Sequence, residues 1–257
     1  MKIMALETSG ASGSVALLEN GAELAFLELD ADGRSAKTLA PAIQKALSDA
    51  GLAPKELDAV AVTIGPGSFT GLRVGVATCK AFAWGIGAKV VGTDTLDAIV
   101  AGICASEQIS AWGGDAPLVL SVGVDAQRGD AAVRNYEISS TDAGFVWRRL
   151  EDAFQVISLR EWLGKAASNV LFAGPALSRV KNLSTNYPNA RLVEESLWSP
   201  TARGVGEVAR KRLAEDATGD DLWALLPIYS RRAAAEEKRL ERERLERETQ
   251  SGDALKS

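Results

Sequence analysis

One stretch of the chain, residues 57–87, limits the folds that the sequence can adopt. It reads LDAVAVTI, then GPGSFTGLRVG, then VATCKAFAWGIG. Its first eight residues are apolar apart from one aspartate and one threonine, which is typical of a strand buried on both faces. Gly65-Pro66-Gly67 predicts a sharp turn, because two glycines surround a proline of fixed φ. A helix over about 70–85 follows, with Ser68 or Thr70 as its N-cap. The stretch therefore predicts the strand–turn–helix unit of an α/β fold.

The predicted helix has one stripe of small side chains at four-residue spacing. The stripe consists of Gly71, Gly75, Cys79 and Ala83. A glycine inside a helix costs about 1 kcal/mol relative to alanine, so two of them predict the close approach of another helix or strand. That neighbour is either this chain's own sheet or a second chain, and the residues alone leave both interpretations open.

The glycine-rich turn matches none of the common catalytic or phosphate-binding motifs. No Lys-Ser or Lys-Thr pair follows Gly71, as a P-loop requires, and Thr70 occupies the third glycine position of a dinucleotide fingerprint. A GxSxG nucleophile elbow is missing as well. We therefore do not predict catalysis from this loop.

Composition excludes several classes of function. The 257 residues can hold one large or two medium domains, and a net charge of −5 argues against autonomous nucleic-acid binding. The sequence has no histidine, which excludes an HExxH zinc site and a Ser-His-Asp triad. Cys79 and Cys104 are interpreted as buried thiols of a cytoplasmic protein. We expect no membrane association, because Glu7 interrupts the N-terminal apolar segment and no run of about 18 apolar residues follows.

The order of predicted elements repeats along the chain. Residues 2–105 predict three strands and then alternating helices and strands, and after a Gly-rich segment the pattern restarts with a strand at 118–125. Glu7 and Asp125 hold equivalent places, each at the end of the first strand of its half. This repeat is typical of a duplicated actin-like, RNase H-like α/β fold (the ASKHA superfamily) with two βββαβα-type lobes. Either acid alone would be interpreted as a turn-capping carboxylate, whereas the pair suggests a site for nucleotide phosphates and metal.

The repeat predicts where the domains lie. We expect an N-terminal lobe over 1–108, completed by a segment near 200–232, and a C-terminal lobe over 109–199. Beyond these, 233–257 is a charged and disordered tail.

Individual elements are predicted less sharply. We expect a helix over about 39–50, with Thr38 as N-cap and Pro41 in its first turn. In the second half we expect one strand over 145–157 and a helix within 176–187.

Several motifs together resemble the TsaB (YeaZ) family. They are the GPGSFTGLRVG loop, the ALETS segment at the first turn, LAPAI at 39–43, VDAQRGDAAVRNY at 124–136 and PIYSRR at 227–232. They extend from residue 3 to about residue 232, and the loop is the most specific of them. The family acts in the bacterial pathway that installs threonylcarbamoyl on adenosine 37 of tRNA.

The resemblance implies a non-catalytic scaffold that activates its paralogue, the transferase TsaD. It implies a TsaB–TsaD heterodimer joined by the small ATPase TsaE, with tRNA reached only through the complex, and a homodimer when TsaD is absent. Helices of the N-terminal lobe carry the partner contacts in this family. On this chain the corresponding residues are Leu39, Ile43, Phe69, Gly71, Arg73, Gly75, Cys79 and Ala83.

Nucleotide binding is the less defined part of the resemblance. The positions nearest to a nucleotide would be Glu7, Thr8, Ser9 and Asp125. The family typically has Asp where this chain has Glu7, and His-Ser where it has Ser35-Ala36, which weakens any nucleotide or metal site here. We therefore expect no cofactor and no metal bound by this chain alone, with ATP or ADP placed at the interface with the partner.

Two enzymatic functions remain as alternatives. The first is an actin-like small-molecule kinase that uses Glu7 and Asp125 around ATP-magnesium, although residues 172–176 (FAGPA) make a poor adenosine loop. The second is a glycoprotease, which the sequence supports least because it shows neither metal ligands nor a nucleophile–base pair.

Overall fold

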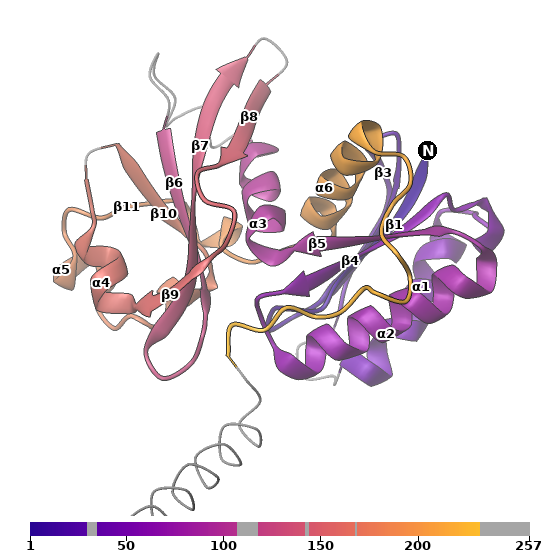
Figure 1. Cartoon of the computed structure of the whole chain (residues 1–257), viewed down its shortest axis with the longest axis horizontal. Coiled ribbons are helices and arrows are strands. Elements are labelled where there is room, and N and C mark those ends of the chain that lie inside the picture. The colour runs from indigo at the N-terminus through magenta and orange to yellow at the C-terminus, as the bar shows by residue number, and fades with distance from the viewer. Residues whose placement is uncertain (30–34, 107–117, 142–143, 168, 232–257) are drawn as a thin grey trace, which may run out of the picture.

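The computed structural model describes residues 1–29, 35–106, 118–141, 144–167 and 169–231. These residues form two lobes, each built on one mixed sheet (Figure 1). The predicted tail and most of the Gly-rich segment between the lobes lie outside the described residues, as do the side chains of Ser35 and Ala36. No helix in the described ranges is both long and apolar enough to cross a membrane.

The first sheet has the strand order β3-β2-β1-β4-β5. Its antiparallel half is a meander and its parallel half is joined by crossover helices. The strands are β1 (Lys2–Glu7), β2 (Ser14–Glu19), β3 (Ala22–Glu28), β4 (Ala59–Gly65) and β5 (Lys89–Asp94). The helices of this half are α1 (Ser35–Asp49), α2 (Phe69–Ile86) and α3 (Thr95–Cys104), with a 3₁₀ turn at Pro54–Glu56.

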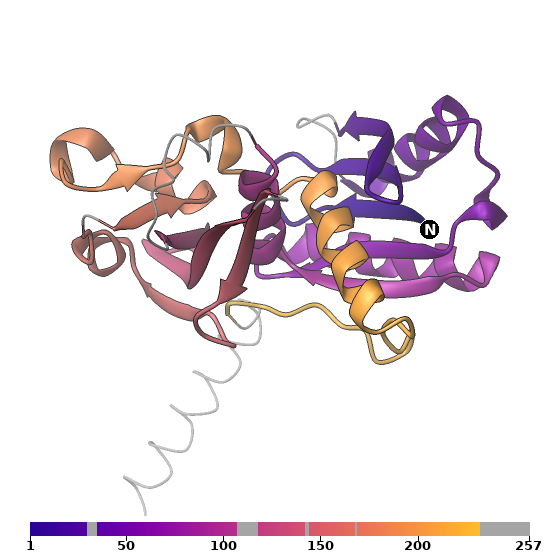
Figure 2. The same ribbon diagram turned by 90° about the horizontal axis from the view of Figure 1, so that it is seen from above.

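Alternation along β1 shows how this sheet is covered. Met4 and Leu6 pack in the cluster that contains α1 and α2, whereas Ile3 and Ala5 pack against α6 (Ala202–Glu215). Successive side chains of a strand point to opposite faces, so the four consecutive apolar residues 3–6 of β1 require helices on both faces. Figure 2 shows α6 crossing one face of the sheet. The last helix among the described residues thus belongs to the first sheet.

The second sheet repeats the order of the first. Its path is β11-β10-β6-β7-β8. In both sheets the first strand pairs on one side with the antiparallel second strand and on the other side with a parallel strand, which is β4 in the first sheet and β10 in the second, and β9 adds a further pairing to β7. The strands are β6 (Leu118–Asp125), β7 (Asp130–Thr141), β8 (Gly144–Arg149), β9 (Gln155–Ser158), β10 (Val170–Ala173) and β11 (Arg191–Leu192). The helices are α4 (Leu159–Gly164) and α5 (Leu183–Asn186), with 3₁₀ turns at Pro175–Arg179 and Glu195–Leu197.

Three predicted elements differ from the structure. The helix α1 begins four residues before the predicted start, so Pro41 lies inside it and Thr38 is not its N-cap. The single strand predicted over 145–157 is two strands, β8 and β9, which pair with different parts of β7. The helix predicted within 176–187 is a 3₁₀ turn followed by the four-residue helix α5.

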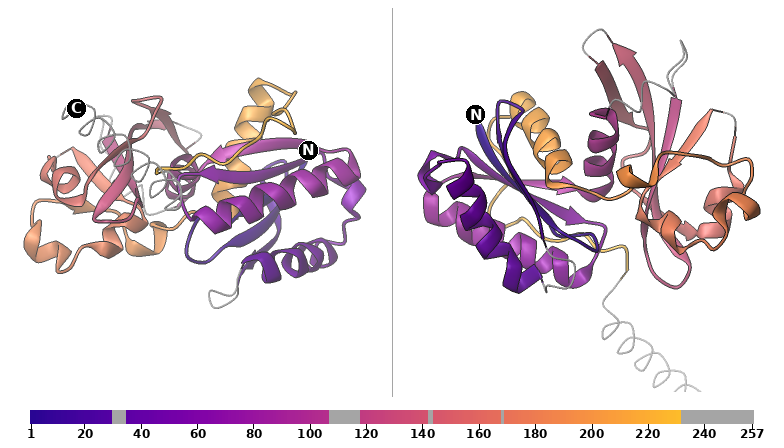
Figure 3. Two further views of the ribbon diagram at one scale, coloured as in Figure 1. Left: turned by 60° about the horizontal axis from the view of Figure 1, so that its bottom comes forward. Right: turned by 180° about the vertical axis from the view of Figure 1, so that it is seen from behind.

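A C-terminal strap, residues 219–231, runs from α6 back across the first lobe (Figure 1, yellow). Asp220 forms an isolated bridge with Val90, which extends the edge of the sheet at β5. The amide of Ile228 then donates to the carbonyl of Ile64 at 2.6 Å. At its end, Arg231 forms an ion pair with Asp130 of the second lobe. The strap therefore lies beside α2 and contacts both lobes (Figure 3).

Candidate functional site

The small-residue stripe of α2 faces this chain's own sheet. A Cβ atom at Gly71 would lie 1.9 Å from the carbonyl oxygen of Thr8, and one at Gly75 would lie 2.1 Å from the Thr8 Oγ1. Cys79 donates its thiol to the Val60 carbonyl at 3.5 Å. The glycines let the helix pack directly on the end of β1. Of the two interpretations that the sequence left open, internal packing holds for this stripe.

This result corrects most of the predicted partner contacts. The residues concerned are buried in the first lobe: Leu39, Ile43, Gly71, Gly75, Cys79 and Ala83. Leu39 and Ile43 pack beneath the sheet together with Cys79 and Ala83. Buried side chains cannot form the surface of a complex, so these six positions support the lobe from inside. Only Phe69 and Arg73 of the predicted set reach the surface.

The opposite face of α2 is exposed and nearly without charge. Its exposed side includes Arg73, Ala77, Ala81, Trp84 and Gly85. All of them except Trp84 are offset by two residues from the buried stripe, which is about 200° around a helix. An 18-residue helix with no acidic residue is unusual for a water-facing element, and its Trp84 is 70% exposed. The predicted stripe therefore faces the sheet, and the exposed face of the same helix is formed by other residues.

An apolar groove lies between this exposed face and the C-terminal strap. It has a volume of about 690 Å³. Its walls are formed by α2 (Arg73, Val76, Ala77, Lys80, Ala81 and Trp84) and by the strap (Leu222, Trp223, Leu225, Leu226, Pro227 and Tyr229). At one end Arg73 lies over the Phe69 ring at 3.9 Å, and its Nε donates to the Tyr229 hydroxyl at 2.9 Å. This surface is the candidate functional site.

The first predicted nucleotide position, Glu7, is closed onto its own turn. Its Oε1 accepts hydrogen bonds from the amides of Ser9 at 2.6 Å and Gly10 at 3.2 Å. The residue is fully buried, and burial raises its pKa to about 7, although the hydrogen bonds from these donors lower the pKa and offset part of the shift. Thr8 and Ser9 are buried as well. The carboxylate thus stabilises the turn between β1 and β2.

Asp125, the equivalent residue of the second lobe, is also engaged locally. It accepts from the amide of Gln127 at 2.8 Å and forms an ion pair with Arg179 at 2.8 Å. Its position at the end of β6 matches that of Glu7 at the end of β1. Within the described ranges, no group of three or more Cys, Asp or Glu residues is arranged to hold a metal ion.

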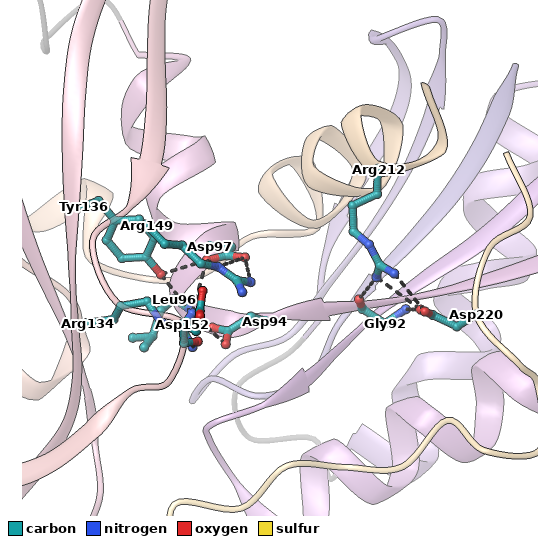
Figure 4. A network of polar contacts seen from close by, with 10 residues as sticks. All are labelled: Gly92, Asp94, Leu96, Asp97, Arg134, Tyr136, Arg149, Asp152, Arg212 and Asp220. Carbon is teal, nitrogen blue, oxygen red and sulfur yellow. Dashed lines mark hydrogen bonds and ion pairs between the residues drawn. The ribbon is translucent and has the colours of Figure 1, made fainter. Parts of the chain in front are cut away.

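A polar network that the sequence did not predict joins the two lobes (Figure 4). Asp94 caps α3 by accepting from the Leu96 amide, and its other oxygen accepts from Arg134 of β7 at 2.9 Å. Asp97 accepts from the Tyr136 hydroxyl at 2.8 Å and from the Arg149 Nε at 3.0 Å. The only sequence signal was a few charged side chains within otherwise apolar segments, which does not indicate their partners.

Burial sets the electrostatics of this network. Burial, together with the neighbouring Asp97 charge, raises the pKa of Asp94 even though Arg134 opposes the shift. Burial alone would lower the pKa of the Arg134 guanidinium, but the charges and hydrogen bonds of Asp94 and Tyr136 together outweigh burial and the pKa rises. Arg134 is 3% exposed, so its ion pairs are shielded from water. The network therefore fixes the second lobe on the N-terminus of α3.

Comparison with known proteins gives one consistent family. The family model for TsaD, tRNA N6-adenosine threonylcarbamoyltransferase, matches residues 30–238. The tRNA threonylcarbamoyladenosine biosynthesis protein TsaB of Bacillus subtilis (strain 168) is 27% identical over 251 residues, which cover 94% of this chain and 99% of that protein. TsaB of Haemophilus influenzae is 37% identical over 99 residues, or 38% of this chain and 42% of that protein. The solved structure of YeaZ from Pseudomonas aeruginosa has a TM-score of 0.69 at 22% identity, covering 89% of this chain and 99% of that one.

The two lobes have equivalent strand orders, and the family model matches residues in both lobes. These findings define a protein with the duplicated actin-like (ASKHA) fold. Within this class, the chain belongs to the TsaB (YeaZ) family. The fold and the family predicted from the sequence are confirmed.

Proposed function

We propose that this chain is an accessory subunit in the formation of N6-threonylcarbamoyladenosine at position 37 of tRNAs. It forms a heterodimer with TsaD and activates that transferase, and it carries no catalytic residues of its own. The observation that carries the proposal is the exposed face of α2, a helix surface with one cation, small side chains and an exposed tryptophan. A face of this kind is typical of a surface that a partner covers.

The two turn carboxylates support a non-catalytic role. An autonomous kinase of this fold would present free carboxylates to ATP-magnesium. Glu7 instead accepts through Oε1 from the amides of its own turn, and Asp125 accepts from the Gln127 amide and pairs with Arg179. The full sequence also has no histidine to act as a base or a metal ligand. We propose that ATP or ADP is required only at the interface with the partner, that TsaE joins the heterodimer, and that tRNA is bound by the complex.

Reconstitution tests this function. Purified TsaD from the same organism is assayed on an unmodified tRNA transcript with and without this chain, and modified nucleoside is quantified after digestion. We expect modification to depend on the chain and to be lost with Ala81→Glu, which places a charge on the exposed face. Gly85→Ala adds one methyl group to the same face and is the matched control, with activity retained. Full modification by TsaD alone would contradict the proposal.

A further inference from the structure

A cavity of about 540 Å³ lies between the two lobes, around the carboxyl end of β5. Residues of β5, α3 and α6 line it from the first lobe, and residues of β7, β8 and the segment after β8 line it from the second. The strap supplies the rest of the lining, and α2 contributes no residue to it. A volume of this size is within the range of small-molecule sites, so the cavity has room for an organic ligand that contacts both lobes.

The charged side chains that line this cavity are acidic in excess, with five aspartates against three arginines. Each arginine forms an ion pair with an aspartate of the same lining, in the pairs Arg134–Asp94, Arg149–Asp97 and Arg212–Asp220. Figure 4 shows these pairs as two groups, one beside α3 and one below α6. The carboxylates of Asp152 and Asp221 remain, and neither forms an ion pair with a cation of the described chain. The cavity therefore favours a cationic ligand.

Thr93 of β5 adds an unpaired hydroxyl to this lining. The residue is 1% exposed, and its Oγ1 has no hydrogen-bond partner among the described residues. Side chains alternate along a strand, so Thr93 points to the same face of the sheet as Val91, which packs against α6. On that face Val208 of α6 also lines the cavity. Because buried hydroxyls are normally hydrogen-bonded, this one marks a position at which a ligand donor would be accepted.

The uncharged part of the lining is mainly apolar. Leu226 is 67% exposed and Ile228 is 44% exposed, so an alkyl chain in the cavity would cover apolar surface. A metal ion would leave that surface uncovered, and the described ranges hold no group of three or more acidic or cysteine side chains arranged to bind one. The ligand that fits is therefore extended, with positive charge near its ends and methylene groups between them. The apolar lining residues are Ile64, Val208, Ala224, Leu225, Leu226 and Ile228.

We propose that the interlobe cavity binds a linear aliphatic polyamine. One ammonium pairs with Asp152 of the second lobe, another pairs with Asp221 of the strap, and Thr93 Oγ1 accepts a hydrogen bond from the ligand. The methylene groups pack on the apolar lining. Because Asp152 and Asp221 come from different parts of the fold, the bound ligand bridges the second lobe and the strap.

The test is isothermal titration of the full chain with spermidine at low ionic strength. We expect one spermidine per chain, and we expect Asp152→Asn and Asp221→Asn each to weaken binding at least tenfold, because each removes a charge-assisted hydrogen bond. An asparagine at 221 keeps the Oδ1 atom that accepts from the Trp223 and Ala224 amides. Glu195→Gln is the matched control, because it removes one exposed acid outside the cavity and should leave the affinity unchanged. Circular dichroism checks that the free variants keep the wild-type melting temperature.

Three results would overturn the inference. The first is the absence of spermidine binding to the wild type. The second is equal weakening by Glu195→Gln and by the two aspartate variants, which would show nonspecific attraction of a polycation to a chain of net charge −5. The third is binding of hexylamine as tight as that of spermidine, which would show a site for a single ammonium, such as a lysine side chain of another protein. None of these readouts involves TsaD or tRNA, so the proposed function is tested separately.

Discussion

Replacing Gly71 by alanine tests whether the small stripe of α2 packs on this chain's own sheet. The new Cβ would lie 1.9 Å from the carbonyl oxygen of Thr8. That atom belongs to the backbone at the end of β1, so it cannot move aside as a flexible side chain would. Helix α2 or the first turn has to shift by about 1 Å to restore an ordinary contact.

Two opposing terms set the size of the effect. Alanine is favoured over glycine inside a helix by about 1 kcal/mol. Overpacking a close contact costs about 1–3 kcal/mol, and more where the backbone has to move. Gly85 of the same helix is the control, because a Cβ there meets no atom within 4 Å. Gly85→Ala therefore gains up to about 1 kcal/mol from helix propensity alone. The propensity gain is common to both variants, so they should differ by the overpacking cost of roughly 1–3 kcal/mol.

Thermal unfolding followed by circular dichroism measures this difference. For a protein of this size 1 kcal/mol corresponds to about 2–4 °C in Tm, so the variants should melt roughly 2–12 °C apart, Gly71→Ala at or below and Gly85→Ala at or above the wild type. Equal stability of the two variants would show that the stripe does not pack on β1. The same reasoning applies to Gly75, where a Cβ would lie 2.1 Å from the Thr8 Oγ1. A bulky residue there would therefore test folding and not partner binding.

Three further predictions follow from buried groups. Because burial raises the pKa of Glu7 from its ordinary value of 4.5 to about 7, the native state binds the proton more tightly than the unfolded state. Stability should then fall as pH rises from 4.5 to 7, by roughly 3 kcal/mol in total, and urea unfolding of Glu7→Gln should show a flatter pH dependence. Arg134→Met should cost about 3–5 kcal/mol because it leaves the largely buried Asp94 carboxylate without its cation, whereas the exposed Arg148→Met should leave Tm almost unchanged. Burial also raises the pKa of Cys79 to about 12, so iodoacetamide at pH 8 should label this thiol only after unfolding, whereas Cys104, predicted to be buried, is partly exposed and should react first; labelling of Cys79 in the native protein would contradict its burial.

Local sequence patterns predicted the fold well because each of them depends only on residues that are close together in the sequence. Short-range rules predict the apolar strand before Gly65 and the Ser68 cap of α2. They also predict the repeated strand–turn–strand unit, whose first strand ends in Glu7 in one lobe and in Asp125 in the other. The position of Pro41 was predicted less well, because a helix accepts an internal proline when tertiary packing compensates.

The candidate site depends on information that local patterns do not contain. A four-residue spacing shows that small side chains share a face, but not whether that face meets a sheet or a partner. On α2 the buried stripe with Gly75 and the exposed stripe with Ala81 have the same spacing, and only the fold distinguishes them. The strap wall of the groove and the contacts of Arg134 join residues far apart in sequence, so no spacing rule could reveal them.

The most direct test of the account is the mass of the complex formed with TsaD. This chain and TsaD from the same organism are mixed and measured by size-exclusion chromatography with light scattering, in parallel with Ala81→Glu and Gly85→Ala. The account predicts a one-to-one complex for the wild type and for Gly85→Ala, and separate proteins for a folded Ala81→Glu. A complex that survives Ala81→Glu would show that the exposed face of α2 is not the partner surface. If the wild type forms no complex, the scaffold function itself is contradicted.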